Sequence, residues 1–322
     1  MQIPNLLKTG DTIAITAASG ICTNTKLING IRTLENMGLK VQVMDSCHAT
    51  HGQYLAGEDK LRINDLHTAF ADKNVKGIFM ARGGYGAARL LPSLNYNLIR
   101  QNPKVFVGYS DVTALHIFLS QFCKLATFHG PMPVSCFGGE ETHPLTLASF
   151  KAAVVTNEAS RISQCLQKQS LLFGGEQTHA NLMALHLGHA SGLLTGGNLS
   201  VIASTLGTPY EIKTRGRILF LEDIQEEPYR VDRLLLQLKL AGKLKDAAGI
   251  VFGDFSPETL ETLYIAIQEL VLTEKKPTIW GFPSGHTSPN LTLPLGQEVT
   301  LAADPANPQL FLSRCLSCQR TN

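Results

Sequence analysis

The chain has 322 residues, 44% of them hydrophobic and 17% charged, and its 28 Lys and Arg nearly balance 26 Asp and Glu for a formal net charge of +2. This composition is typical of a globular protein with one large domain or two, and it gives no electrostatic reason to expect nucleic acid or an anionic membrane as a partner. Pro4, Lys8 and Asp11 interrupt any apolar core of a secretory signal, and no apolar run reaches the ~18 residues of a membrane-spanning helix.

The first third of the chain alternates strand and helix patterns. Four short apolar runs have strand character, at residues 12–18, 40–44, 77–81 and 104–108. Helical patterns separate them, around 27–34, over 57–72 and near Ala87. This alternation predicts a parallel sheet covered by helices, with right-handed crossovers and a site at the carboxyl ends of the strands.

The pattern weakens after Phe137, where GGEETHPLTLASF and the polar stretch through Gln177 indicate a connecting region. Strand patterns return at 217–221, 249–254 and 278–281, and an amphipathic helix is expected over 229–240. We therefore predict an N-terminal domain over residues 1–136, a connecting region over 137–189 and a second α/β domain over 190–322.

One reactive side chain follows the strand at 104–108. In KVFVGYSDVTALHIFL, Ser110 and Asp111 occupy a sharp turn between that strand and a helix. A serine there holds its Oγ away from the backbone, with the first helical N–H groups nearby to receive negative charge. The turn has the character of a nucleophile elbow, although Val112 stands where a second glycine is usual. The alternative is that Ser110 or Asp111 simply caps the helix, as these residue types often do.

A glycine-rich turn follows the strand at 77–81. In GIFMARGGYGAARLLPSL, Arg82 is followed by Gly83 and Gly84. Adjacent glycines let backbone N–H groups point into a concave site, as an oxyanion hole requires. Phosphate binding is the alternative, but GGYG matches neither the dinucleotide fingerprint nor the P-loop.

Two further segments carry an acid and a base. The strand RILFLEDI ends in Glu222 and Asp223, and strand alternation allows only one of them to point into a given site. The loop IWGFPSGHTSPN carries His286 after an apolar strand. A serine nucleophile needs a histidine base and an acid that orients it, roles that His286 and Glu222 could fill. A lone loop histidine is, however, more often a solvated surface residue.

The remaining histidines and two arginines suggest no second site. His129 lies in a turn, and His116 lies on the helix after Ser110. Three more histidines cluster without the spacing of a zinc site, and they are His179, His186 and His189. On the helix at 229–240, Arg230 and Arg233 could face either solvent or a substrate carboxylate, and solvent is the default interpretation.

The cysteines are seven in number and scattered, at Cys22, Cys47, Cys123, Cys136, Cys165, Cys315 and Cys318. In a chain with no secretory signal, this pattern indicates the reduced thiols of a cytosolic protein. Cys315 and Cys318 form a Cys-x-x-Cys, whose alternative reading is a metal or redox site. Since no second pair and no helix pattern accompany them, we favour plain thiols and expect neither a metal nor a cofactor.

Taken together, the motifs resemble the LD-carboxypeptidase family, serine peptidases that trim muropeptides and include relatives giving immunity to peptide-nucleotide antibiotics. The resemblance runs from LLKTGDTIAITAASG to the His286 loop, and it is carried in order by RGGYGAARLLPSLNY, NPKVFVGYSDVTALH, FHGPM, GGNLSVIASTLGTPYE, ILFLEDIQEEPYRVDRLLLQL, GIVFGDF and GFPSGH. One departure is AASG after the first strand, where the family pattern has a proline; it touches the first loop and none of the catalytic motifs.

The resemblance implies catalytic roles for matching residues. It implies Ser110 as nucleophile, Glu222 as acid and His286 as base, with the backbone N–H groups of Gly84 and Asp111 as the oxyanion hole. It also implies a flavodoxin-like N-terminal domain that carries the serine and a swivelling β/α C-terminal domain that carries the acid and the histidine.

The implied reaction removes the terminal D-alanine from a cytoplasmic murein tetrapeptide during murein recycling. The resemblance also implies a homodimer. An exopeptidase must also bind the free carboxylate of the departing residue, and Arg82 and Arg233 are candidates beside backbone N–H groups. Two alternatives stay open: an immunity-type peptidase that cleaves a peptidyl-nucleotide amide, and a non-catalytic α/β ligand-binding protein.

Overall fold

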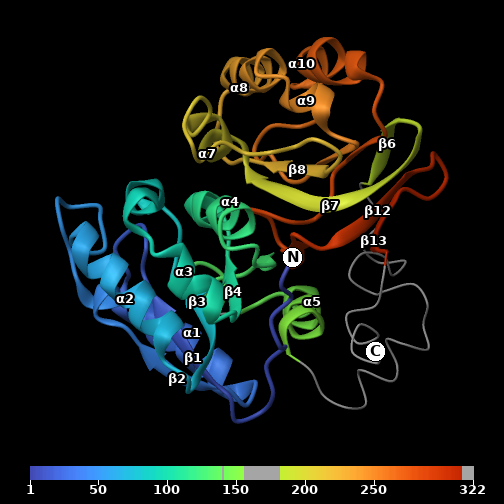
Figure 1. Cartoon of the computed structure of the whole chain (residues 1–322). Helices are drawn as coiled ribbons and strands as arrows, with labels where there is room; N and C mark the ends of the chain where they lie inside the picture. The colour runs from blue at the N-terminus through green and yellow to red at the C-terminus, as the bar shows by residue number, and fades with distance from the viewer. Residues whose placement is uncertain (140, 156–181, 314–322) are drawn as a thin grey trace. The chain divides into compact units, whose positions relative to one another are not determined.

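The computed structural model describes residues 1–139, 141–155 and 182–313. These residues form two compact units, one built from 1–155 with Thr292–Pro294 and the other from 182–291 with 295–313 (Figure 1). Each unit contains one sheet with a core of parallel strands, together with helices, so the α/β prediction with two domains is confirmed. No helix among the described residues is both long and apolar enough to cross a membrane.

The first unit is built on a six-stranded sheet with the order β11-β5-β4-β3-β1-β2. Its strands are β1 (Thr12–Thr16), β2 (Lys40–Val43), β3 (Val75–Met80), β4 (Val105–Gly108), β5 (Thr127–His129) and β11 (Leu293–Leu295). The pairs among β1 to β5 are parallel, and their order is the flavodoxin-like 2-1-3-4-5. The strand order reverses between β1 and β3, because β2 lies on one side of β1 and all later strands lie on the other. A ligand site is expected at the carboxyl ends of these two strands.

Helices and short helical turns connect these strands, and they are α1 (Asn24–Asn36), η1 (Asp45–His48), α2 (Asp59–Ala71), η2 (Ala87–Ser93), α3 (Tyr96–Gln101), η3 (Ser110–Val112), α4 (Thr113–Gln121) and α5 (Pro144–Val154). Near Ala87 the predicted helix is a 3-10 helix, because Pro92 lies inside it and cannot donate an α-helical hydrogen bond. Every residue of α4 is buried, so that helix runs through the core of the unit.

The region after Phe137 differs from the prediction of a connecting region over 137–189. Its helix α5 lies in the first unit, and Phe150 is fully buried with its ring 5.6 Å from that of Phe79. The apolar residues of α5 are spread around the helix, so the sequence shows no stripe there. The opening signal is Pro144 at the first turn, after His143, whose side chain accepts a hydrogen bond from the N–H of Leu145.

The second unit is built on a seven-stranded sheet with the order β13-β12-β7-β8-β9-β10-β6. Its strands are β6 (Met183–His186), β7 (Gly188–Asn198), β8 (Ile218–Glu222), β9 (Gly249–Phe252), β10 (Thr278–Trp280), β12 (Glu298–Ala303) and β13 (Gln309–Leu312). The centre β7-β8-β9-β10 is parallel, and the pairs of β6, β12 and β13 are antiparallel. Its helical segments are α7 (Leu199–Ser204), α8 (Pro228–Leu240), α9 (Lys243–Asp246), α10 (Tyr264–Ala266), η4 (Ile267–Val271) and η5 (Leu272–Glu274).

In both units the carboxyl ends of the parallel strands carry the polar side chains of interest. In the first unit these ends lead to the segments at 17–20, 81–87 and 109–111. In the second unit, Asn198 ends β7, Glu222 ends β8 and His286 lies in the loop after β10. In open parallel sheets, ligands generally bind at the carboxyl ends of the strands, and the polar side chains of both units lie at those ends.

Candidate active site

Ser110 lies directly after β4 at a strained backbone position. Its φ is +65°, in the left-handed region that a residue with a side chain rarely adopts, and its side chain is half-buried. Neither η3 nor α4 has a capping side-chain hydrogen bond, and their N-cap residues are Tyr109 and Val112. Ser110 therefore does not serve as a helix cap, and the backbone strain is of the kind found at nucleophile turns.

Asp111 also does not cap α4. Its Oδ2 accepts hydrogen bonds of 2.6 Å from the hydroxyl of Ser19 and of 2.8 Å from the N–H of Ala87. Burial raises the pKa of this carboxyl, and the two donors act in the opposite direction. The side chain thus joins the turn at Ser110 to the segments that follow β1 and β3.

The glycine turn after β3 lies against Ser110. A Cβ placed on Gly83 would be 2.7 Å from both Cβ and Oγ of Ser110 and 3.6 Å from the backbone nitrogen of Asp111. The carbonyl of Gly83 accepts a 3.1 Å hydrogen bond from the N–H of Gly20. In a trans peptide the N–H points opposite to the carbonyl, so the N–H of Gly84 is directed away from Gly20.

The turn also needs glycine for its own geometry. Gly84 has φ +119°, and a Cβ there would be 3.2 Å from Cα of Gly20. A Cβ on Gly20 would be 2.9 Å from the carbonyl oxygen of Gly83. The AASG segment after β1 therefore packs on the glycine turn backbone to backbone, which explains why it ends in glycine.

The two arginine candidates for the substrate carboxylate have different surroundings. The half-buried Arg82 donates from Nη1 to the carbonyl of Ile21 at 3.0 Å and from Nε to that of Gly83 at 3.3 Å. These bonds engage two of its five N–H donors. Arg233 is exposed on α8, with its guanidinium 5.4 Å from the ring centroid of Tyr229. Arg82 is thus the candidate that lies beside the glycine turn.

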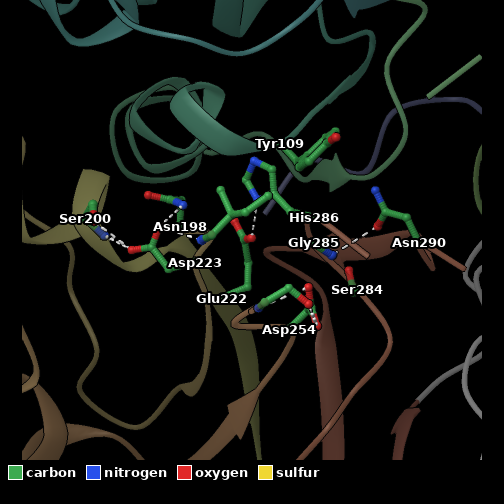
Figure 2. A network of polar contacts seen from close by, with 12 residues as sticks. Tyr109, Asn198, Ser200, Glu222, Asp223, Asp254, Ser284, Gly285, His286 and Asn290 are labelled. Carbon is green, nitrogen blue, oxygen red and sulfur yellow. Dashed lines mark hydrogen bonds and ion pairs between the residues drawn. The ribbon is translucent and has the colours of Figure 1, made fainter. Parts of the chain in front are cut away.

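In the second unit, Glu222 and His286 form a close pair (Figure 2). Oε2 of Glu222 accepts a hydrogen bond of 2.7 Å from Nδ1 of His286. The side chain of Glu222 has no exposed surface, and that of His286 is 15% exposed. Burial alone would lower the pKa of His286, but the hydrogen bond and the charge of Glu222 raise it above its ordinary value, with Asp223 and Asp254 adding to the effect.

This pairing fixes the tautomer of the imidazole. With Nδ1–H donating to the carboxylate, Nε2 of neutral His286 is the acceptor nitrogen, as a general base requires. Gly285 has φ +115°, and a Cβ there would be 2.6 Å from Oε2 of Glu222, so only glycine lets the loop close over the carboxylate. The N–H of Gly285 donates 3.1 Å to Oδ1 of Asn290, which supports the same loop. His286 is therefore not a solvated surface histidine.

Asp223 belongs to a different group of contacts, as strand alternation predicts. Its carboxylate accepts from Nδ2 of Asn198 at 2.8 Å and from the N–H and Oγ of Ser200 at 2.9 and 2.7 Å (Figure 2). Burial raises its pKa, while these donors oppose the shift. Asn198 and Ser200 were not predicted from the sequence. The available signal is that Asn198 ends β7 and Ser200 lies in the first turn of α7, so both lie at the carboxyl end of a strand.

The other histidines play structural roles or lie elsewhere. His116 is buried, its ring nitrogens lie 2.8 Å from Oγ1 of Thr127 and 2.8 Å from the carbonyl of Gly108, and burial lowers its pKa to about 3. His129 is also fully buried. Among the described residues, no group of three or more His, Cys, Asp or Glu side chains could hold a metal ion. His179 and the Cys315–Cys318 pair lie outside the described residues.

Comparisons with known proteins give one family. A model described as LD-carboxypeptidase N-terminal domain matches residues 13–130, and one described as LD-carboxypeptidase C-terminal domain matches residues 191–301. A probable murein peptide carboxypeptidase of Bacillus subtilis is 40% identical over 92% of this chain and 91% of its own.

Two solved structures resemble this chain over nearly its whole length. That of the microcin C7 self-immunity protein MccF, a protein of Escherichia coli, matches with a TM-score of 0.82 at 26% identity and covers 97% of this chain and 99% of its own. That of a muramoyltetrapeptide carboxypeptidase from Oxalobacter formigenes matches with a TM-score of 0.76 at 29% identity and covers 94% and 99%. Both matches extend over the two units.

Proposed function

Since this chain belongs to the LD-carboxypeptidase family, we propose that it is a serine carboxypeptidase that releases the terminal D-alanine from murein tetrapeptides. The observation that carries the proposal is the 2.7 Å hydrogen bond from His286 to the buried carboxylate of Glu222. A buried acid that orients a partly exposed imidazole is the base half of a catalytic triad. The strained Ser110 turn supplies the nucleophile half.

The reaction is an acyl transfer to Ser110 followed by hydrolysis. Nε2 of His286 takes the hydroxyl proton of Ser110, and Oγ attacks the carbonyl carbon of the L-configured centre that precedes D-alanine. The C–N bond then breaks, and the imidazolium returns the proton to the departing amine. Water, deprotonated by His286, attacks the acyl carbon, the bond to Oγ breaks, and the imidazolium returns the proton to Oγ of Ser110 as the shortened peptide leaves. Glu222 stabilises the imidazolium that forms in each step.

The tetrahedral oxyanion is held by the backbone N–H groups of Gly84 and Asp111. Support comes from the contact of Gly83 with Ser110 and from the hydrogen bond between Gly20 and Gly83, which turns the N–H of Gly84 away from the first loop. Loss of one such donor typically lowers the rate by ~100- to 1,000-fold. Arg82 is our candidate for the ligand of the substrate carboxylate, with Arg233 as the second candidate.

The proposal extends to the setting of the enzyme. The product is the tripeptide of murein recycling in the cytoplasm, and the active species is a homodimer. The scattered cysteines support a reducing compartment, since three of the cysteines among the described residues are free thiols: Cys22, Cys47 and Cys123. The family resemblance supports the dimer.

The test is mass spectrometry of a murein tetrapeptide incubated with purified wild type, Ser110→Ala or His286→Ala. We expect the wild type to yield the tripeptide and D-alanine, and both variants to lose at least ~1,000-fold in rate. A Ser110→Ala variant that releases D-alanine as fast as the wild type would sink the proposal. A wild type that neither turns over the peptide nor reacts with a fluorophosphonate would favour a non-catalytic binding protein.

One alternative substrate has an observation in its favour. The similarity to the microcin C7 self-immunity protein covers nearly the whole chain with a TM-score of 0.82. The same Ser, His and Glu could cleave a peptidyl-nucleotide amide, because that bond is also attacked at an acyl carbon. Feeding both substrates to the wild type separates the two functions, and a kcat/KM for the peptidyl nucleotide above that for the tetrapeptide would select the alternative.

A further inference from the structure

One oxygen atom joins the three segments that surround Ser110. Oδ2 of Asp111 accepts the hydroxyl of Ser19 at 2.6 Å and the N–H of Ala87 at 2.8 Å. Ser19 follows β1, Ala87 follows the glycine turn after β3, and Asp111 follows Ser110 in the turn after β4. Ser19 is fully buried, and Asp111 is 5% exposed. Loops that are far apart in the sequence thus share a single buried acceptor.

A buried arginine makes a second tie between the same segments. Arg62 on α2 has no exposed surface, and its Nη1 donates to the carbonyls of Ala18 and of Gly86, the latter at 3.2 Å. These carbonyls belong to the residues just before Ser19 and Ala87. Gly86 has φ +125°, and a Cβ there would be 2.7 Å from Nη1 of Arg62, so the glycine is needed for this approach.

The two buried charges act on each other. Burial raises the pKa of Asp111, whereas its donors and the positive charge of Arg62 favour the carboxylate. Arg62 also forms an ion pair with Asp59 on its own helix. Charges buried in this way contribute little net stability compared with apolar residues of the same size, but they require one specific geometry. The main effect of Asp111 and Arg62 is therefore to fix the positions of the segments that they join.

That placement concerns the two N–H groups that hold the oxyanion in the proposed mechanism. The N–H of Gly84 lies on the segment fixed through Gly86 and Ala87, and the N–H of Asp111 belongs to the residue whose side chain makes the tie. Displacement of a catalytic group by about 1 Å can lower a rate by about 100-fold. Hydrogen bonds that hold these backbone segments in place therefore affect the rate of the reaction.

We propose that Ser19 and the side chain of Asp111, supported by Arg62, are positioning residues that hold the oxyanion hole in register with Ser110. The inference rests on the proposed function of Ser110. It also gives a role to the AASG segment, whose serine ties the first loop to the nucleophile turn.

The test compares Ser19→Ala with Ser46→Ala. Ser46 is a matched control, because it is also fully buried and its Oγ accepts from the N–H of Ala17 at 3.0 Å beside β1, without touching Asp111. We expect Ser19→Ala to lower kcat for D-alanine release by about 10-fold with KM within about twofold of wild type. Ser46→Ala should keep both constants within about twofold. Equal losses in the two variants, or none in Ser19→Ala, would overturn the inference.

Two variants of Asp111 provide the rescue experiment. Asp111→Asn keeps an acceptor oxygen for Ser19 and Ala87, whereas Asp111→Ala removes it. We expect the asparagine variant to retain at least ~10-fold more kcat than the alanine variant at an unchanged KM. Equal kcat values in two folded variants would mean that the acceptor has no positioning role.

Hydrogen exchange separates this inference from the proposed function. Ser19→Ala should speed amide exchange in the peptides covering 83–87 and 109–112, and Ser46→Ala should not. If the wild type shows no turnover, the proposed function fails, and unchanged exchange in Ser19→Ala would still refute the tie. Faster exchange with undiminished kcat would refute the positioning role and leave the proposed function intact.

Discussion

Nδ1 of His286 lies 2.7 Å from Oε2 of Glu222, and the glycine before the histidine lies so close to the same oxygen that no side chain fits there. The carboxylate is fully buried, and the imidazole keeps a small exposed surface. The local structure therefore fixes one nitrogen of a histidine whose side chain keeps some exposed surface. This arrangement differs from an exposed ion pair, in which both partners are mobile and the net contribution is small.

Glu222→Gln tests the charge of this pair. The variant keeps the shape of the side chain but removes the charge that stabilises the imidazolium, and we expect kcat to fall by about 1,000- to 10,000-fold. The measurement is the steady-state rate of D-alanine release. Glu211→Gln is the control, because Glu211 pairs with Lys243 at 2.9 Å and not with a histidine, and the change should alter kcat by less than twofold. A Glu222→Gln variant with more than a tenth of wild-type kcat would contradict the role of Glu222.

The pH dependence follows from the raised pKa of His286. The base must be neutral, so kcat/KM should fall as the pH drops through that pKa, with a midpoint above the ordinary value of about 6.5. Glu222→Gln should move the midpoint to lower pH, because the carboxylate that raises the pKa is gone. A pH–rate profile of both proteins checks this, and an unshifted acid limb in the variant would exclude the Glu222–His286 pair as its origin.

Stability should depend on pH in the opposite direction to activity. A histidine with a raised pKa in the folded state stabilises the fold fully below its unfolded-state pKa, and this contribution disappears as the pH rises through the folded-state pKa. The pair should therefore add stability near pH 6 that is absent near pH 9. Chemical unfolding of wild type and His286→Ala at both pH values tests this; the difference between the proteins should be larger at pH 6.

Gly83→Ala tests the contact between the glycine turn and the nucleophile. The added Cβ would be 2.7 Å from Oγ of Ser110, so either the serine or the turn must move. We expect kcat to fall by at least ~100-fold while the protein stays folded. Gly139→Ala is the control, since the carbonyl oxygen of Glu141 would be 3.8 Å from the new Cβ, an ordinary van der Waals distance. Similar kcat values for the two variants would show that the turn does not approach Ser110.

Phe150→Ala tests whether α5 is part of the core of the first unit. The ring of Phe150 is fully buried and lies 5.6 Å from that of Phe79 and 5.1 Å from that of Phe137. Truncation to alanine should lower the free energy of unfolding by about 3–5 kcal/mol. Lys151→Ala, an exposed neighbour on the same helix, should change it by less than about 0.5 kcal/mol. Equal unfolding midpoints would place α5 outside the core.

Much of the fold could be predicted because strands and glycine turns leave strong local signals. The runs at 12–18, 77–81 and 104–108 correspond to β1, β3 and β4, since a strand buried on both faces reads as a continuous apolar run. The helix α5 was not predicted, because its apolar residues do not form a stripe along one side of the helix. Its role in the core depends on partners such as Phe79, which is distant in the sequence.

For the site, local reasoning proposed candidate residues but not the contacts that hold them. Glu222 ends a strand, and Ser110 and His286 lie in the segments after strands, which is visible in the sequence. On local grounds alone, a helix cap is the favoured interpretation of Ser110 or Asp111. The positive φ of Ser110 and the contacts of the Asp111 carboxylate argue against it. Arg62 had a signal, because it lies one helical turn before Leu66 on the buried side of α2. A charge on that face indicates a specific buried partner.

The most direct test of the account is the site of covalent attachment on the protein. Wild type, Ser110→Ala and His286→Ala are treated with a fluorophosphonate, and their peptides are mapped by mass spectrometry. The account predicts one adduct on the peptide that contains Ser110 in the wild type, much slower labelling in His286→Ala and no adduct in Ser110→Ala. An adduct on another serine, or D-alanine release that continues undiminished when Ser110 is replaced, would contradict it.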